Sequence, residues 1–403
     1  HMVTFRFAQP EDAALILRFI RGLAEYEKMT DEVVATEELL REWIFEKGKA
    51  EVLFAVADGT EVGFALFFHN FSTFLGRAGI YLEDLFVLPE HRGHGYGKAL
   101  LKRLAAITVE RGCGRLVDFA ALAPEVVGFS DDGRGVQSDG LMEEAMRRAA
   151  QVGKPVVAHC EVDDLLRGGY IHDGEYCRAH GHKGICSESE WRQVERDIAL
   201  AEKTGCQYHV CHVSTRESVE LVRRAKARGL RVSCETAPHY LLLCDEDLQE
   251  DGRFKMNPPL RTREDQAALI AGLLDGTIDM IATDHAPHTR EEKSRGLEHS
   301  AMGVVGLETA LAVLHTGLVR TGALPMEALI ARMSTVPARR FGLPCGVTEG
   351  APADFAVFDP ETQWTIDPEA FASLGRATPF AGREVTGQIQ MTVCGGEIVW
   401  KAK

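Results

Sequence analysis

Four short apolar runs along the chain each end in a polar residue that can bind a metal ion. The runs are FSDDG (129–133), VVAHCE (156–161), YHVCHVS (208–214) and MIATDHAPH (280–288). The candidate ligands that they carry are Asp132, His159, His212 and Asp284. If the runs are parallel strands of a (β/α) barrel, their C-terminal ends bring the four side chains together. Aspartate and neutral imidazole are zinc ligands, so the pattern predicts a binuclear zinc centre with a bridging carboxylate.

Each of these residues also has an ordinary structural explanation. A histidine beside a β-run is most often a hydrogen-bonded core residue, and an Asp-Asp-Gly sequence is most often a turn. The occurrence of all four at strand-to-helix boundaries favours the metal site. The flanking histidines are expected to be structural, and they are His209, His239 and His285. His180-Gly181-His182 lies in a polar, glycine-rich stretch and is not expected to supply ligands.

A glycine-rich sequence, Arg92-Gly93-His94-Gly95-Tyr96-Gly97, lies between an apolar run and a helical pattern. At such a turn, backbone N–H groups and the helix dipole can bind a pyrophosphate. The signal is weak by itself, and an ordinary tight turn explains it equally well. The side chain of His94 is expected to face solvent.

The predicted secondary structure follows two different patterns, one in the first part of the chain and one from Val117 onward. The first part reads as a strand (4–9), two helices (to Lys28, then 36–46) and an antiparallel meander (51–59, 61–70 and 79–88). From Val117 onward, apolar runs near 126–130, 155–159, 207–213, 230–236 and 278–283 alternate with helical patterns. That alternation predicts βα units with parallel strands. Runs at 353–360 and 388–401 predict a small β appendage at the end of the chain.

Composition narrows the partners and the compartment. The 403 residues carry a formal net charge of −15, which argues against nucleic acid or an anionic membrane as partner and favours small molecules. Neither a signal sequence nor an apolar stretch of the roughly 20 residues that a membrane span needs is recognised. The ten cysteines form no CxxC pair, which fits a reducing compartment, so a cytoplasmic location is expected. A homo-oligomer is compatible with the sequence.

Residues 117–403 resemble the type I dihydroorotases, the zinc-dependent cyclic amidohydrolases of pyrimidine biosynthesis. The motifs that carry the resemblance are FSDDGRGVQ, AHCE, HVCHVS, MNPPLR and IATDHAPH. The resemblance implies that Asp132 bridges two zinc ions and that His159 and His212 bind the second. It assigns Asp284 as both ligand and general base, taking a proton from the water that attacks the ring amide.

The same resemblance implies substrate contacts at Asn257 and His288 and along the main chain around Met302 and Gly303. Hydantoinases and dihydropyrimidinases commonly carry a carboxylated lysine where this chain has Asp132. Dihydroorotate, interconverted with N-carbamoyl-aspartate, is therefore the expected substrate.

Residues 1–116 resemble the GNAT acetyltransferases. The run HNFSTFLGRAGIYLEDLFVLPEHRGHGYGKALLKRLA (69–105) is similar to their spermidine/spermine N-acetyltransferase branch. The resemblance implies that acetyl-CoA binds the main chain of Leu85, Phe86 and Val87 and the loop Gly93, His94, Gly95, Tyr96, Gly97 and Lys98. It implies amine contacts at Tyr26, Glu27, Glu83 and Asp84, and carboxylates suit a polycationic amine.

Together these features predict an α/β chain of three parts. A partial GNAT-type α+β portion (1–116) joins a partial (β/α)8 amidohydrolase barrel (117–345, strands four to eight), which a small β appendage (346–403) follows. The dihydroorotase His-x-His-x-Arg strand has no counterpart, and nothing after Leu116 resembles the GNAT helix that carries the general-acid tyrosine. Three hypotheses follow: a dihydroorotase-like enzyme whose missing elements come from another subunit, a catalytically incompetent hybrid of two partial enzymes, or an acetyl-CoA-dependent N-acetyltransferase.

Overall fold

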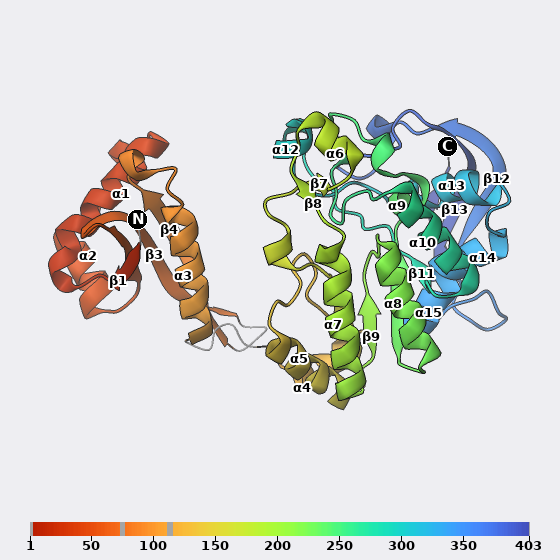
Figure 1. Cartoon of the computed structure of the whole chain (residues 1–403), viewed down its shortest axis with the longest axis horizontal. Helices are drawn as coiled ribbons and strands as arrows, with labels where there is room; N and C mark the ends of the chain where they lie inside the picture. The colour runs from red at the N-terminus through yellow and green to blue at the C-terminus, as the bar shows by residue number, and fades with distance from the viewer. Residues whose placement is uncertain (1–2, 73–76, 111–115, 403) are drawn as a thin grey trace. The chain divides into compact units, whose positions relative to one another are not determined.

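The computed structural model describes residues 3–72, 77–110 and 116–402. The chain divides into two compact units, one of residues 1–118 and one of residues 119–403 (Figure 1). Within the described residues, no helix combines the length and the apolar character that crossing a membrane requires.

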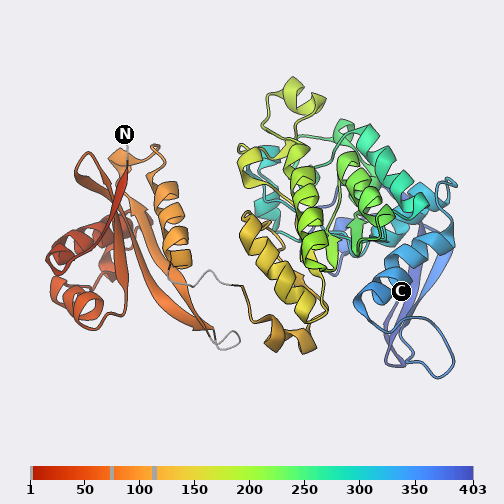
Figure 2. The same ribbon diagram turned by 60° about the horizontal axis from the view of Figure 1, so that its bottom comes forward.

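The first unit is built on a four-stranded antiparallel sheet. Its strands follow chain order: β1 (Thr4–Phe7), β2 (Glu51–Ala57), β3 (Thr60–Ser72) and β4 (Arg77–Val87). Asp58 and Gly59 both have positive φ, at 50° and 78°, as expected of the tight turn that joins β2 to β3. Figure 2 shows the long β3–β4 pair of this sheet.

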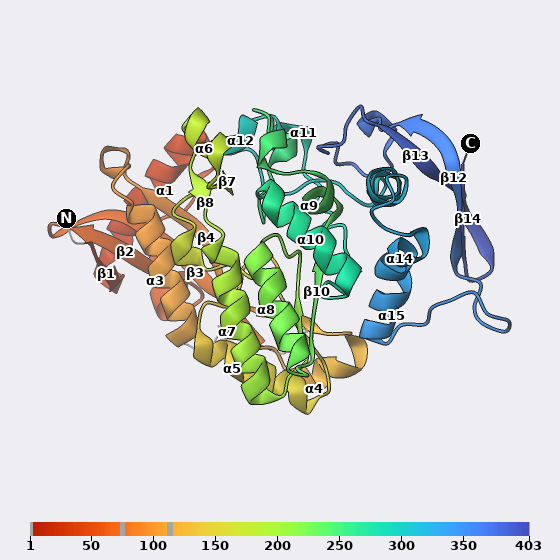
Figure 3. The same cartoon turned by 45° about the vertical axis from the view of Figure 1, so that its right-hand side comes forward.

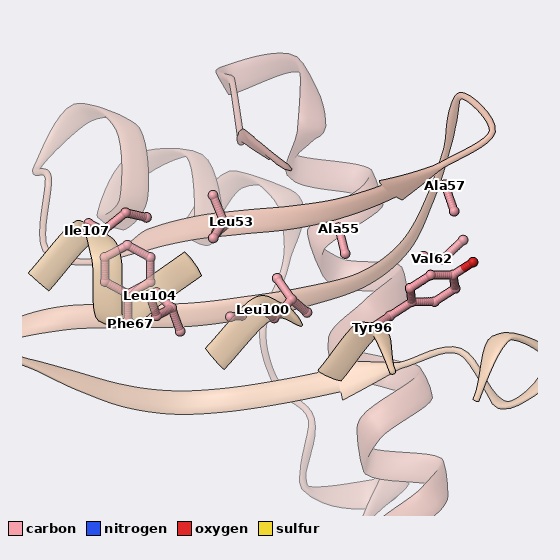
Figure 4. Packing of buried hydrophobic residues seen from close by; sticks show 10 residues of the cluster. Leu53, Ala55, Ala57, Val62, Phe67, Tyr96, Leu100, Leu104 and Ile107 are labelled. Carbon is pink, nitrogen blue, oxygen red and sulfur yellow. The ribbon is translucent and has the colours of Figure 1, made fainter. Parts of the chain in front are cut away.

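Helices cover both faces of this sheet because alternate residues of a strand point to opposite sides. Leu53 and Ala55 belong to a core cluster with one face of α3 (Tyr96–Glu110), shown in Figure 4. Val52 and Phe54 instead pack with α1 (Ala13–Glu27) and with the helical segment that follows α2 (Glu37–Leu40). The predicted meander and its helices are confirmed.

The second unit is built on a five-stranded parallel sheet in the order β11-β10-β9-β6-β5. The strands are β5 (Phe129–Ser130), β6 (Val156–Ala158), β9 (Tyr208–Val210), β10 (Val232–Thr236) and β11 (Met280–Ile281). Each strand lies inside one of the five apolar runs that predicted it, and the pairing is parallel as expected. The strands are short, and β5 and β11 are the two ends of the sheet.

Four helices alternate with these strands and pack beside one another (Figures 1 and 3). They are α5 (Asp139–Gln151), α7 (Glu188–Thr204), α8 (Arg216–Ala227) and α10 (Arg263–Asp275). Side-chain caps fix where three of them begin: Ser138, Thr215 and Thr262 each accept a hydrogen bond from a backbone N–H of the first turn. Gly205 and Gly276 end α7 and α10 in the left-handed conformation, at φ values of 68° and 84°.

Shorter elements complete the second unit. Strand β7 (Ile171–His172) pairs in parallel with β8 (Gly184–Ile185). The remaining short helices are α4 (Phe119–Leu122), α6 (Glu175–His180), α9 (Pro238–Leu242), α11 (Arg290–Lys293), α12 (Gly296–His299), α13 (Ala310–Leu314), α14 (Met326–Ile330) and α15 (Val336–Phe341). At the end of the chain, β12 (Phe355–Thr365), β13 (Glu384–Cys394) and β14 (Glu397–Lys401) form an antiparallel sheet, as the tail pattern predicted.

Candidate functional site

Three of the four candidate metal ligands lie together. The ligand atoms of Asp132, His159 and His212 are all within 4.8 Å of one another. Asp132 comes two residues after β5, His159 directly after β6 and His212 two residues after β9. Because these three strands are neighbours in the parallel sheet, their C-terminal ends bring the three side chains to one place. No other group of three possible ligands occurs among the described residues.

The two imidazoles have the geometry of a shared metal ion. Nδ1 of His159 lies 3.0 Å from Nε2 of His212, and both side chains are buried. In a tetrahedral zinc site with Zn–N bonds of about 2.0–2.1 Å, two ligand nitrogens lie about 3.3–3.4 Å apart. The other ring nitrogen of His159, Nε2, is buried without a hydrogen-bond partner. The donor set and its spacing therefore fit a zinc ion.

The backbone at two candidate residues is in the left-handed region. His212 has a φ of 35° and Asp284 a φ of 48°, which are unusual values for residues other than glycine. Such conformations persist where the surrounding structure holds them, and they cluster at functional sites.

The loop that carries His212 is held by a buried carboxylate. Glu190 of α7 accepts hydrogen bonds from the hydroxyls of Thr215 and Ser218 at 2.9 and 2.8 Å, and also from the backbone and hydroxyl of Ser214. On its other side the loop joins β10, because the backbone N–H of Val213 donates to the carbonyl of Glu235 at 2.7 Å. Hydrogen bonds on both sides of the loop thus hold the left-handed turn at His212 in place.

The neighbouring residues Asp131 and Asp132 make different contacts. Asp131 accepts hydrogen bonds from the backbone N–H groups of His159 and Val136, both at 2.8 Å, so it ties the β5 turn to the β6 turn. Burial raises the pKa of Asp131 above its usual range. The carboxylate of Asp132, by contrast, lies beside the ring nitrogens of the two histidines.

Asp284 follows β11 and is not a member of the three-residue group. Burial raises the pKa of its carboxyl group, and the negative charge of Asp132 adds to the effect, whereas His212 and His159 oppose it. The carboxyl group of Asp284 is partly buried and lies near the three-residue group, whose charges affect its pKa.

The expected substrate contacts form two sets. His288 Nε2 lies 2.6 Å from the carbonyl oxygen of Met302, and the N–H of Gly303 donates to the carbonyl of Lys255 at 3.1 Å. Gly303 has a φ of 121°, and a Cβ there would lie 2.7 Å from the Cβ of Ala286, so only glycine fits. Asn257 belongs to the other set, because it bonds to Glu161 beside His159.

Two residues of this region were missed in the sequence. Glu161, the last residue of VVAHCE, accepts a hydrogen bond from Nδ2 of Asn257 at 2.8 Å and lies 3.6 Å from Nε2 of His159. The buried Lys293 donates to the carbonyls of Lys255 and Ala301 at 2.9 and 2.7 Å, and burial lowers its pKa to about 8. Its position two residues after His159 could have indicated a role for Glu161 in the sequence. Its hydrogen-bond partner Asn257, however, is 96 residues away. For Lys293 nothing local distinguishes it from a surface lysine.

The flanking histidines and the His-x-His sequence are not members of the three-residue group. His209 hydrogen-bonds to Ser233 and Glu235, and His285 accepts from the backbone of Gly306. His239 is buried, and its burial lowers its pKa to about 3. His182 bonds to Glu250 and Tyr170, so the His-x-His sequence is engaged away from the three-residue group.

The first unit contains a cleft of about 600 Å³. Seven of the nine residues expected at acetyl-CoA line it: Leu85, Phe86, Val87, Gly93, Gly95, Tyr96 and Gly97. Gly93 and Gly95 have φ values of 82° and 80° and lie just before α3. His94 and Lys98 are exposed and are not lining residues, and Nδ1 of His94 lies 3.0 Å from the carbonyl oxygen of Arg92.

Only some of the residues expected to contact an amine line this cleft. Tyr26 and Glu27 line the cleft, whereas Glu83 and Asp84 do not. The pKa of Asp84 is nevertheless raised by burial and by the negative charges of Glu83 and Glu27, so both glutamates lie near Asp84. The guanidinium of Arg92 lies 4.4 Å from the ring centroid of Tyr26 and occupies part of this region.

Comparison with known proteins finds relatives of both families. Residues 96–218 match the family model for dihydro-orotase-like proteins, and residues 20–125 match that of the acetyltransferase (GNAT) family. Over 300 residues the chain is 54% identical to the dihydroorotase of Bacillus caldolyticus, covering 74% of this chain and 70% of that protein. Over 310 residues it is 53% identical to the dihydroorotase of Brevibacillus brevis, covering 76% and 73%.

Solved structures of related enzymes share the fold. An L-hydantoinase (dihydropyrimidinase) from Arthrobacter aurescens is similar with a TM-score of 0.63 at 28% identity, covering 70% of this chain and 66% of that one. A dihydropyrimidinase from Brevibacillus agri has a TM-score of 0.60 at 25% identity, covering 68% and 62%. The chain thus spans slightly less than two thirds of these two structures. The chain belongs to the dihydroorotase family, and its residues 20–125 match the GNAT acetyltransferase family.

Proposed function

We propose that this chain is a zinc-dependent cyclic amidohydrolase that interconverts dihydroorotate and N-carbamoyl-aspartate in pyrimidine biosynthesis. The observation that carries the proposal is the facing pair His159 Nδ1 and His212 Nε2, with Asp132 beside it at the ends of neighbouring strands. The identity of 54% to a dihydroorotase supports the substrate. In this reading the five parallel strands are strands four to eight of a (β/α)8 barrel, and the enzyme works on small molecules in the cytoplasm.

Asp132, His159 and His212 would hold the zinc, with Asp284 nearby. When bound, zinc polarises the carbonyl of the scissile amide and lowers the pKa of a water molecule. Asp284 would accept a proton from the attacking water on a carboxylate oxygen and pass it to the departing ring nitrogen. Its partly buried position beside the three-residue group raises its pKa, and the pKa of a general base is best placed near the working pH.

Asn257 and the main chain at Gly303 would orient the substrate. The side-chain amide of Asn257 has both a donor and an acceptor, which matches the N–H and C=O groups of a cyclic amide. Its bond to Glu161 fixes the direction of this amide. His288 holds the Met302 carbonyl and thereby the loop that carries Gly303.

The substrate is tested by an assay of selectivity. Zinc-loaded protein is offered dihydroorotate, dihydrouracil and hydantoin at equal concentration, and ring opening is followed for each. We expect turnover of dihydroorotate at least tenfold above that of the other two. A preference for dihydrouracil or hydantoin would assign the site to the hydantoinase and dihydropyrimidinase activities instead. No turnover of any substrate by zinc-loaded protein would support the reading as a catalytically incompetent hybrid.

The first unit favours a second function, binding of acetyl-CoA. The observation is the cleft in which Gly93 and Gly95 precede the N-terminus of α3, so that backbone N–H groups can receive a pyrophosphate. The carboxylates Glu27, Glu83 and Asp84 would receive an amine. Binding is tested by a thermal shift, because a ligand of the native state raises the melting temperature. The absence of a shift at millimolar acetyl-CoA would refute it.

A further inference from the structure

One carboxylate, that of Glu161, contacts both the metal-ligand candidates and the substrate-contact candidates. Its side chain is buried, at 9% residue exposure, three residues after the end of β6. Oε1 accepts a hydrogen bond of 2.8 Å from Nδ2 of Asn257. Oε2 lies 3.6 Å from Nε2 of His159. The two oxygens of one side chain thus face two different parts of the site.

The histidine side of this arrangement is incomplete without the carboxylate. Nδ1 of His159 faces His212, so a metal ion shared by the two rings would be bound through Nδ1. The proton of a neutral imidazole must then be on Nε2, which is buried and has no hydrogen-bond partner within 3.5 Å. The Glu161 carboxylate is the acceptor nearby, and it is only slightly beyond hydrogen-bonding distance.

The position of Glu161 is itself fixed from two directions. Its backbone N–H donates to Oε1 of Gln193 at 3.0 Å, and its carbonyl accepts from Nε2 of Gln137 at 2.7 Å. Gln193 also donates to the carbonyl of His159 at 3.3 Å. A Cβ on Gly135 would lie 2.4 Å from the Gln193 side chain, so the close packing of this glutamine requires glycine there. These contacts make the short segment from His159 to Glu161 a rigid unit.

We propose that Glu161 is a positioning residue that couples the metal subsite to the substrate subsite. Oε2 receives the Nε2–H of His159 and keeps Nδ1 directed at the metal, while Oε1 holds the amide of Asn257 in place for the substrate. Ligating histidines commonly donate their second N–H to a carboxylate, which fixes the tautomer and the ring orientation. The inference rests on the proposed function, because it assumes that His159 binds zinc.

The test is Glu161→Gln, with zinc affinity as the first readout. A glutamine can still accept from Asn257, but its NH2 group can no longer accept the proton of His159. We expect zinc affinity to fall by about 10- to 100-fold, measured by competition with a chromophoric chelator. The matched control is Glu250→Gln, which breaks another Glu–His pair, with His182, outside the three-residue group. It should leave zinc affinity within twofold, and an unchanged affinity in Glu161→Gln would overturn the proposal.

A second readout separates this inference from the proposed function. In metal-free protein at pH 8.5, imidazole nitrogen NMR should show His159 as the Nε2–H tautomer, and Glu161→Gln should reduce that population. If the wild type binds no zinc, the proposed function fails, but the tautomer still decides whether the pair exists. A wild-type His159 protonated on Nδ1 would refute the pair.

Stability of the variant is controlled by its melting curve. If Glu161→Gln does not fold, Glu161→Asp takes its place, because it keeps the charge but is one methylene too short to reach both partners. Zinc affinity should fall in this variant too, and wild-type affinity in a folded Glu161→Asp would contradict the proposal.

Discussion

His159 and His212 are 53 residues apart in the sequence, yet Nδ1 of one lies 3.0 Å from Nε2 of the other. Parallel pairing of β6 with β9 produces this contact, because it places the ends of the two strands next to each other. Asp132 joins them from the end of β5, the other neighbour of β6. The proposed zinc site depends on this pair.

Asp284→Asn should abolish ring opening of dihydroorotate while the protein stays folded. The amide cannot accept the proton of the attacking water, and loss of a general base typically costs about 10²- to 10⁴-fold in rate. Turnover and the melting temperature are measured on the same sample. Asp275→Asn is the control, since this half-exposed carboxylate pairs with Arg223 on the outer surface. Loss of activity that only parallels a loss of stability would contradict the assigned role.

Glu190→Gln should destabilise the second unit by about 2–4 kcal/mol, because an amide cannot accept all the hydrogen bonds that the loop from Ser214 to Ser218 donates. The free energy of unfolding is measured by urea titration. Glu195→Gln, at an exposed position of the same helix, should change it by less than about 0.5 kcal/mol. Equal effects of the two substitutions would contradict this explanation of the left-handed turn at His212.

Stability should depend on pH through His172. Burial and the adjacent Arg261 lower the pKa of His172 to about 4. Arginine only donates, so Nδ1 of His172, 3.2 Å from Nη1 of Arg261, must accept and the ring must be neutral. The unfolded chain binds a proton near pH 6.5, so this contribution to stability is complete above that pH and is lost as pH falls toward 4.

The expected loss from His172 between pH 7 and pH 5 is about 2 kcal/mol. His172→Gln keeps an acceptor for Arg261 but cannot titrate, so the variant should lose that much less stability over the same interval. Urea midpoints of both proteins across this range provide the measurement. Parallel pH profiles for the two proteins would show that His172 is not responsible.

Gly95→Ala should remove the thermal shift produced by acetyl-CoA. Gly95 lines the cleft at a φ of 80°, where a side chain strains the backbone and changes the direction of the N–H groups. Gly59→Ala is a matched control, because Gly59 has a φ of 78°, lies in the β2–β3 turn and does not line the cleft. Both variants should lose stability to a similar degree, but only Gly59→Ala should keep the shift. A shift retained in Gly95→Ala would argue against phosphate binding by this loop.

Local pattern was enough to predict the five parallel strands and the grouping of Asp132, His159 and His212. Apolar runs locate the strands, and a residue directly after a parallel strand has only one edge of the sheet at which to lie. Glu161, Asp131 and Lys293 could not be assigned in this way, because their partners come from other segments of the chain. The side chain of His94 faces solvent, as the sequence predicted, and the side chain of Lys98 is exposed too, so neither lines the cleft.

Zinc content and dihydroorotate hydrolysis, both measured on the same purified sample, decide whether His159 and His212 form a catalytic metal site. We predict bound zinc that Glu161→Gln weakens, and ring opening that disappears when a chelator removes the metal and returns when zinc is restored. A chain that binds zinc fully but does not open the ring would contradict the account of catalysis. A chain that binds no zinc would contradict the account of the His159–His212 pair as a metal site.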